Sequence, residues 1–370
     1  MSRRGRRRDR ALGLVLPGLP QLLAGRWAAG FALATWMGFA ALVVWRRDRV
    51  VDALSGPWDL RLAVVTAIAG LAGAWLWGTR EAGRASGEGE VRWSPMVGTF
   101  LERRLAVAGM AALGAICLVA LLAPLLAPFD PGAQGDLVRE RFLAPSLDHP
   151  LGTDNLARDV LSRLLYGARI SLTVGLLAVA ISVTLGTGLG AVAGYLGGRT
   201  DAVIMRFVDV VISVPRLVLL ITIVAVFEPG ILVIVVVLGF TLWPSTARLV
   251  RGEVLSLREQ EFIVAARALG LPRRRILARH IIPNALGPVI VAATLGMGNT
   301  IVLEAGLSFL GLGVQAPLAS WGAMVDAGRA NLLGAWWIST FPGLAIVGTV
   351  LAFNLVGEGL RDALDPRHPE

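Results

Sequence analysis

The apolar residues of this chain are gathered into blocks of about 18 to 25 residues, which limits the folds open to it. A helix rises about 1.5 Å per residue, so a block of this length crosses the roughly 30 Å of hydrocarbon in a bilayer. Charged residues make up only 16% of the 370 residues, below the roughly 25% that is usual in soluble domains. These features exclude a soluble enzyme and predict an all-α polytopic membrane protein.

The blocks divide the chain into two parts. Residues 1–94 form an N-terminal hydrophobic module with two spans, near residues 28–45 and 62–78. The apolar stretch 11–25 is interrupted by Pro17 and Pro20, which favours a short re-entrant or interfacial segment over a secretory signal. After a polar linker at 79–92, a domain over residues 95–370 contains six candidate spans: 105–127, 170–196, 207–227, 231–247, 284–303 and 335–356.

The placement of Arg predicts the orientation of these spans. Residues 248–279 contain eight Arg and three Glu, whereas residues 128–169 contain five Arg and six acidic residues. Because basic loops stay in the cytoplasm, the first segment is predicted inside, together with both termini. Arg46, Arg47 and Arg49 would then lie outside, and a full span at 11–25 would invert the core, so the front module leaves an alternative open.

The residue types limit the chemistry of the chain. All 35 basic residues are Arg, so a phosphate-binding Walker A loop and a Schiff-base Lys are both excluded. The single Cys117 and three His predict neither a disulfide nor a metal site. We therefore expect no catalytic residue, metal or cofactor in this chain, and any ATP and Mg to be bound by partner ATPase subunits.

The basic segment 248–283 predicts a short cytoplasmic helix. Ser256 and Glu259 have the spacing of a capping box, Gly270 is placed to end the helix, and Pro283 suits the first turn of the next span. Pattern alone equally supports a helix resting on lipid headgroups. The residues expected to share one face are Phe262, Ala265, Ala266 and Leu269.

The stretch EFIVAARALG at 261–270, continued to Pro283, resembles the coupling loop of ABC-importer permeases, called the EAA loop. In that family the loop docks into the ATPase subunit and transmits its closure to the membrane spans. Val264 stands where the family usually has an acid, and Glu261 lies one turn before it. The resemblance implies that the coupling residues are Glu261, Phe262, Ala265, Ala266, Leu269, Gly270 and Pro283.

Three further stretches are similar to the C-type subunit of dipeptide and oligopeptide importers. They cover residues 149–172, where Ala157 replaces the usual Gly, residues 304–322, and residues 354–367. The four motifs occur in order within residues 95–370. The resemblance implies a six-helix, MetI-like type I importer permease core, with residues 1–94 as an additional module.

The resemblance also implies function and partners. A permease of this kind lies in the inner (plasma) membrane and forms, with a second homologous permease, the pathway for di- or oligopeptides, nickel complexes or other small solutes. Its other partners are two ATPase subunits, an extracytoplasmic substrate-binding protein and the lipid bilayer, with no nucleic acid. The alternative is an ion-coupled secondary transporter without ATPases, which would need several acids at the membrane midplane, where Asp209 is the one plausible example.

Three residue groups within the spans are singled out by their type. Asp209 and Arg216 lie seven residues apart on the third core span, and are interpreted as pathway residues or as a satisfied pair facing one neighbouring helix. Glu304, near the outer end of the fifth span, is predicted to gate or line the pathway. A G-x-x-x-G series favours close helix packing over a phosphate loop, and consists of Gly186, Gly190, Gly194 and Gly198.

Overall fold

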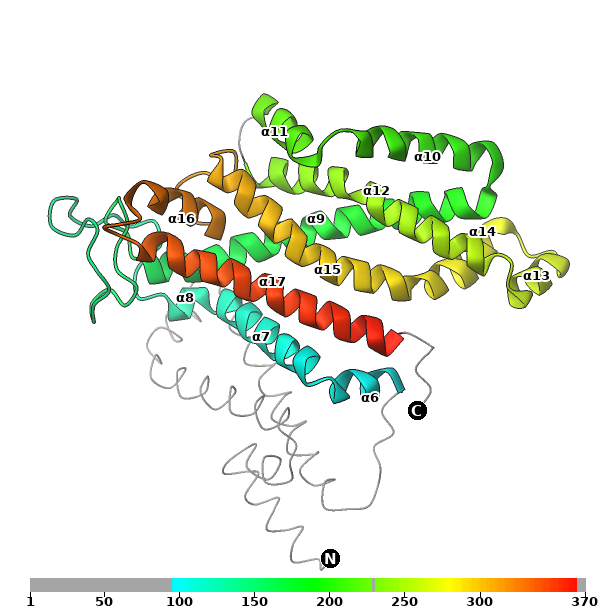
Figure 1. Ribbon diagram of the computed structural model, residues 1–370, viewed down its shortest axis with the longest axis horizontal. Coiled ribbons are helices and arrows are strands. Elements are labelled where there is room, and N and C mark those ends of the chain that lie inside the picture. Colours follow the sequence, from blue (N-terminus) through cyan, green and yellow to red (C-terminus); the bar gives the residue numbers. More distant parts are fainter. Residues whose placement is uncertain (1–94, 228–229, 365–370) are drawn as a thin grey trace, which may run out of the picture.

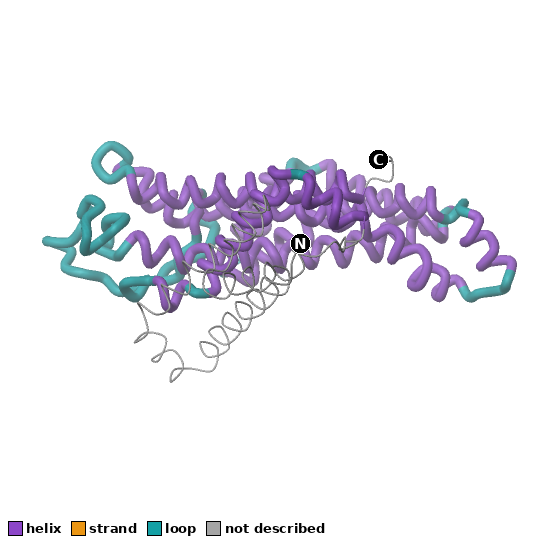
Figure 2. Tube along the Cα trace, turned by 90° about the horizontal axis from the view of Figure 1, so that it is seen from below, coloured by secondary structure: helices purple, strands orange, loops and turns teal. Residues whose placement is uncertain are grey.

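The computed structural model describes residues 95–227 and 230–364, so the module predicted over 1–94 lies outside the described residues. The described part is a bundle of long helices running along one axis (Figures 1 and 2). Its residues form no strand, and one isolated bridge joins Thr153 and Asp159. Five helices are long and apolar enough to cross a membrane, or six if one bent pair counts as a span. The prediction of an all-α polytopic protein is confirmed.

Four of the five spanning helices extend beyond the apolar blocks that predicted them, and α7 ends before its block does. They are α7 (Arg104–Leu121), α9 (Val160–Leu196), α12 (Ile231–Leu257), α15 (Ile282–Phe309) and α17 (Trp337–Leu364). The first predicted span is divided, because α7 is followed by the short α8 (Ala123–Leu126) with Pro124 in its first turn. The Arg-containing segments 160–169 and 248–257 are also helical, so α9 begins before the predicted span at 170 and α12 continues past the predicted end at 247.

The third core span is a bent pair rather than one helix. Helix α10 (Gly198–Ser213) and helix α11 (Arg216–Val226) meet at an angle of 85°. Pro215 has no N–H to donate and disfavours helical geometry at Val214, whose ψ is 130°. The predicted span over 207–227 is therefore broken at Val214 and Pro215, and the bend separates Asp209 from Arg216.

The two ends of the bundle differ (Figure 1). At one end lie α13 (Glu261–Ala268), α14 (Arg273–Ile276) and the π-helical turn η1 (Leu277–Ile281), which leads into α15. Helix α6 (Pro95–Glu102) and the last turns of α17 point toward the same end. At the other end lie the loop over 127–159, α16 (Trp321–Gly328) and the 3-10 turn η2 (Arg329–Asn331).

Helices α9 and α12 form the centre of the described bundle. Glycines of α9 allow α12 to approach closely: a Cβ added to Gly186 would lie 2.8 Å from the carbonyl oxygen of Trp243, and one on Gly194 would lie 2.9 Å from that of Arg251. Gly190 meets the backbone of α12 in the same way. Gly198 does not belong to this surface, because α9 has ended and its Cβ would meet open space.

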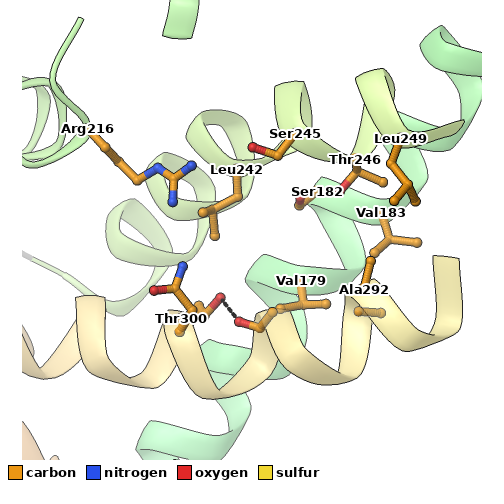
Figure 3. A pocket seen from close by; sticks show the side chains of 13 residues that line it. Val179, Ser182, Val183, Arg216, Leu242, Ser245, Thr246, Leu249, Ala292 and Thr300 are labelled. Carbon is orange, nitrogen blue, oxygen red and sulfur yellow. Dashed lines mark hydrogen bonds between the residues drawn. The ribbon is translucent and has the colours of Figure 1, made fainter. Parts of the chain in front are cut away.

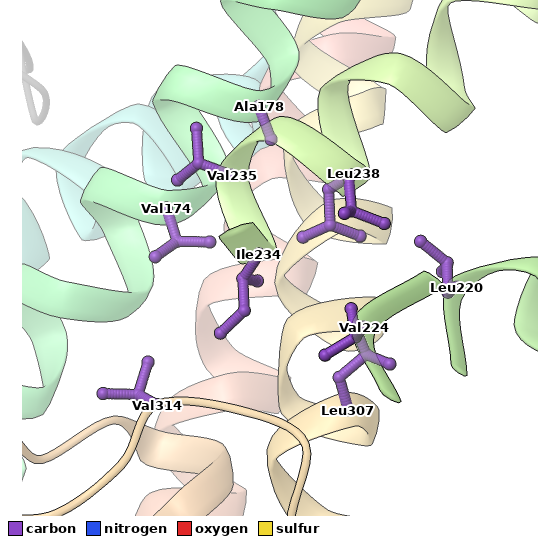
Figure 4. Packing of buried hydrophobic residues seen from close by; sticks show 10 residues of the cluster. Val174, Ala178, Leu220, Val224, Ile234, Val235, Leu238, Leu307 and Val314 are labelled. Carbon is purple, nitrogen blue, oxygen red and sulfur yellow. The ribbon is translucent and has the colours of Figure 1, made fainter. Parts of the chain in front are cut away.

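A buried apolar cluster fixes α11 against this centre (Figure 4). Side chains from α9, α11, α12 and α15 meet there and are almost fully inaccessible. Transmembrane helices associate through such close packing, because the lipid tails are as apolar as the side chains and provide no hydrophobic driving force. The cluster includes Val174, Ala178, Leu220, Val224, Ile234, Leu238 and Leu307.

Candidate functional sites: a helix at the end of the bundle and a mid-height cavity

Helix α13 is a short helix of about two turns at the basic end of the bundle. It begins at Glu261, with Gln260 as N-cap and no side-chain cap. The predicted capping box is wrong, because α12 continues through Ser256. Gly270 ends the helix as predicted: its φ is +75°, its N–H donates to the Arg267 carbonyl at 2.9 Å, and the next N–H reaches the carbonyl of Ala266.

The two sides of α13 have different surroundings. Ile263 and Ala266 are 0% and 8% exposed, and pack in a cluster with residues of α12, α14 and η1. Phe262, Ala265 and Leu269 point outward and are exposed, and we call them the outward stripe. Successive residues of a helix point about 100° apart, so Ala265 lies on the exposed side of α13 and Ala266 on the buried side. The prediction that Ala266 shares one face with Phe262 is therefore wrong.

Polar contacts attach α13 to the ends of the spans. The Arg267 guanidinium donates to the Arg258 carbonyl at 3.1 Å and lies over the ring of Tyr195, 5.4 Å from its centroid. The Arg258 guanidinium in turn donates to the carbonyl of Gly194 at 3.2 Å. Pro283 lies in the first turn of α15, as expected. Helix α13 is thus connected to α9 and α12, and through η1 to α15.

A cavity of about 300 Å³ lies halfway along α9, α12 and α15 (Figure 3). Arg216 contributes the one charged side chain among its lining residues, and also lines a neighbouring cavity of about 190 Å³. The remaining polar residues of the lining were not predicted from the sequence. The signal that could have identified them is that each is a polar residue within an apolar block. They are Ser182, Ser245, Thr246, Asn299 and Thr300.

Asp209 and Arg216 both face α12 but do not meet. The Asp209 carboxylate pairs with Arg248 of α12 at 2.9 Å, and both side chains are more than half exposed. Arg216 forms no ion pair with any described residue and points into the cavity. Asp209 lines neither cavity, so the structure associates only Arg216 with a space that a solute could enter.

Glu304 lies in a buried cluster of serines where α9, α15 and α16 meet. Its side chain is 0% exposed and accepts hydrogen bonds from Ser308 at 2.8 Å and Ser171 at 3.2 Å. Ser320 caps α16 and lies 3.4 Å from the Ser308 hydroxyl. Glu304 lines neither cavity, and its role as a gate stays a prediction.

The motif at 149–172 builds the N-terminal entrance to α9. Asp154 pairs with Arg158 at 2.7 Å and with Arg163 at 3.4 Å, and all three side chains are buried. Asp159 caps α9 by accepting from the Ser162 N–H at 2.7 Å. Because Asp154, Arg158 and Arg163 pair with one another, their charged side chains can be buried at the start of α9.

Long membrane helices around a mid-height cavity, with a helix exposed at one end, define a membrane transport permease. The chain belongs to the family of binding-protein-dependent transport system inner membrane components, which it matches over residues 186–368. Residues 92–145 match a second family, the N-terminal TM domain of oligopeptide transport permease C. It is thus a multi-pass inner membrane permease, and the secondary-transporter alternative receives no support.

Curated relatives cover most of the described domain. The dipeptide transport system permease protein DppC of Alkalihalophilus pseudofirmus is 42% identical over 275 residues, which is 74% of this chain and 90% of that protein. The oligopeptide transport system permease protein OppC of Bacillus subtilis is 40% identical with the same coverage. A chain of the inward-facing MetNI methionine ABC transporter is 18% identical, covers 55% of this chain and 96% of its own, and has a TM-score of 0.46.

Proposed function

We propose that this chain is the C-type permease subunit of an ATP-driven importer of di- or oligopeptides. It forms the pathway with a second, homologous permease, while two ATPase subunits bind its cytoplasmic side and an extracytoplasmic binding protein delivers the substrate. The names of the dipeptide and oligopeptide permeases among its relatives support the peptide class. The outward stripe of α13 carries the proposal, because it leaves an apolar helix face for a partner at the end of the bundle.

The charges support an orientation with α13 in the cytoplasm. Arg258, Arg267, Arg279 and the run 273–275 lie at this end, while acidic residues predominate in the loop at the opposite end. Basic segments next to spans remain inside. The beginning of α6 and the end of α17 then also lie inside, and we place Met1 and Glu370 in the cytoplasm.

The contacts of α13 suggest how ATPase movement reaches the pathway. Ile263 and Ala266 are packed against α12, so a force on the outward stripe moves the helix as a body rather than bending it. Arg267 passes the same movement to Tyr195 at the end of α9. Helices α9 and α12 both line the cavity, so their displacement opens it to one side of the membrane or the other.

Co-purification with the outward stripe altered tests the proposal. The full chain, tagged at its C-terminus, is extracted in mild detergent from membranes that contain its partners. Phe262→Asp places a carboxylate where the ATPase would bury an aromatic ring, which is expected to lower recovery of the ATPases about tenfold or more. Leu147→Asp is the control, because Leu147 is fully exposed at the opposite end.

Three outcomes are informative. Recovery of a second permease and the ATPases with the wild type and with the Leu147 variant, but not with the Phe262 variant, supports the proposal. Equal ATPase recovery with both variants removes the outward stripe from the ATPase contact. Recovery of the wild-type chain alone, active in liposomes without ATP, contradicts the importer itself.

A further inference from the structure

Arg216 occupies a position that calls for an anion. It stands at the bend between α10 and α11 and directs its guanidinium into the cavity between α12 and α15 (Figure 3). No acidic residue lines this cavity or its neighbour, and the nearby Asp209 is already paired with Arg248. A charge within the membrane that lacks a partner is costly unless it serves a water-filled or solute-filled space.

The rest of the lining is suited to a short peptide. The hydroxyls of Ser182, Ser245 and Thr246 and the amide of Asn299 offer donors and acceptors for peptide groups. Thr300 is an exception, because its hydroxyl donates to the carbonyl of Gly296 at 2.7 Å. Apolar residues complete the walls and can accept small side chains: Val179, Val183, Leu242, Leu249, Ala292 and Ala293.

The volume of the cavity and its depth in the bundle are also consistent with a peptide carboxylate bound to Arg216. At about 300 Å³ the cavity is at the lower end of the range for small-molecule sites, enough for one end of a peptide rather than a long chain. Its residues come from the middle of three spanning helices, the depth at which transporters hold their solutes. A planar guanidinium binds a carboxylate through two parallel hydrogen bonds, a geometry that an ammonium group does not provide.

We propose that Arg216 is a specificity-determining residue that holds the C-terminal carboxylate of a peptide in transit. Asn299 and Ser245 complete this subsite by bonding to the last peptide unit. The proposal rests on the proposed function, since it assigns a recognised group to the substrate of that importer. It requires the pathway to prefer peptides with a free C-terminus over the corresponding amides.

Binding to the whole importer complex in nanodiscs, without the binding protein, tests the subsite directly. The probe is radiolabelled trialanine, with unlabelled trialanine and trialanine amide as competitors. We expect the wild type to prefer the free acid about tenfold or more, and Arg216→Gln to remove that preference. Arg216→Lys keeps the charge but loses the paired geometry, so it should retain part of the preference.

Two further variants separate the subsite from a general loss of structure. Asn299→Asp leaves Arg216 in place but supplies a competing carboxylate, so it should weaken the binding of trialanine more than the binding of the amide. Arg206→Gln makes the same change as Arg216→Gln on an exposed residue of α10 that lines neither cavity, and it should behave as the wild type.

The outcomes distinguish this inference from the importer function. An unchanged preference in the Arg216→Gln complex, or equal wild-type affinity for acid and amide, overturns the subsite, including the case in which a lipid phosphate occupies Arg216. A wild-type complex that binds no trialanine, yet hydrolyses ATP when peptide-loaded binding protein is added, also overturns the subsite and leaves the importer standing. Absence of ATP-dependent peptide uptake by the same complex overturns the importer function instead.

Discussion

The guanidinium of Arg267 in α13 lies 5.4 Å from the centre of the Tyr195 ring in the last turns of α9. Ser182, thirteen residues earlier on the same helix, lines the cavity. At about 1.5 Å per residue these two points of α9 are about 20 Å apart. A single continuous helix therefore joins the contact with α13 to the proposed pathway.

Replacing Tyr195 by Leu is expected to weaken coupling without preventing assembly. Leu keeps an apolar side chain but loses the cation–π attraction, which is worth about 0.5–1 kcal/mol at an accessible site. Peptide transported per ATP hydrolysed should fall about two- to fivefold in proteoliposomes. Arg267→Gln should give a similar loss, and the double variant no more than either alone. Two fully additive losses would show that the residues act separately.

Val264 and Glu261 offer a test of the unusual coupling sequence. Both are exposed on α13, and the resemblance to the EAA loop implies an acid where this chain has Val264. If Glu261 replaces that acid in binding the ATPase, Glu261→Gln should reduce ATPase affinity about three- to tenfold, and adding Val264→Glu should restore it. The affinity of ATPase for the purified permease pair measures this. A Val264→Glu change that leaves the Glu261→Gln defect untouched would contradict the substitution.

Local sequence patterns predicted the parts of the fold that are decided locally. Hydropathy located the spans, and Gly270 marked the end of α13 because only a left-handed backbone completes that turn. The prediction failed where short-range signals compete. Ser256 has the spacing of a capping residue, but packing against α9 extends α12 through it. Pro215 was available as a bend signal, but the apolar run on both sides of it was interpreted as one span.

The candidate sites depended more on contacts between distant residues. Ser171 and Glu304 are separated by 133 positions, so their hydrogen bond cannot be derived from spacing. The cavity is similar, because three helices contribute its hydroxyl and amide groups. Arg216 was selected as a charge at membrane depth, whereas Asn299 and Ser182 carry no charge to single them out. Residue type identifies costly groups in a membrane, but not the neighbours that accommodate them.

Glycine 190 should not accept a side chain. A Cβ there would collide with the backbone of Ala247, so Gly190→Ala must push α9 and α12 apart, at a cost of about 1–3 kcal/mol. Gly188 is the matched control, because a Cβ at that position meets nothing within 4 Å. The melting temperature of the detergent-solubilised complex should fall for Gly190→Ala and not for Gly188→Ala. Equal melting temperatures would mean that the two helices can separate without loss.

Glu304 is expected to contribute through its hydrogen bonds. Glu304→Ala leaves Ser171 and Ser308 without their buried acceptor and opens a cavity beside α16. We therefore expect the free energy of unfolding to fall by about 2–4 kcal/mol. Glu304→Gln keeps one acceptor oxygen and most of the volume and should cost less than half as much. The melting temperature reports stability, and peptide uptake at equal expression reports transport. If Glu304→Gln melts like the wild type but abolishes uptake, the carboxylate itself acts in gating.

Ala157 is a position where a smaller residue should increase stability. Its φ is +56°, a left-handed conformation that costs a residue with a Cβ about 1–2 kcal/mol. Gly also has more conformational freedom than Ala in the unfolded chain, which offsets about 0.4–1 kcal/mol of the stability gained by relieving the strain. Ala157→Gly should therefore stabilise the loop over 127–159 by about 0.5–1 kcal/mol and raise the melting temperature by about 1–3 °C.

Gly152 in the same loop provides the opposite case. Its φ is +77°, and an added Cβ would lie 2.5 Å from the carbonyl oxygen of Leu143 and 2.7 Å from Nε1 of Trp337. Gly152→Ala combines backbone strain with a collision, so it should lower the melting temperature, while Ala157→Gly raises it. The two variants lie in the same loop, exchange Gly and Ala in opposite directions, and are measured by the same melting experiment. A decrease for both variants would show that the Ala157 methyl group contributes more by packing than it costs in backbone strain.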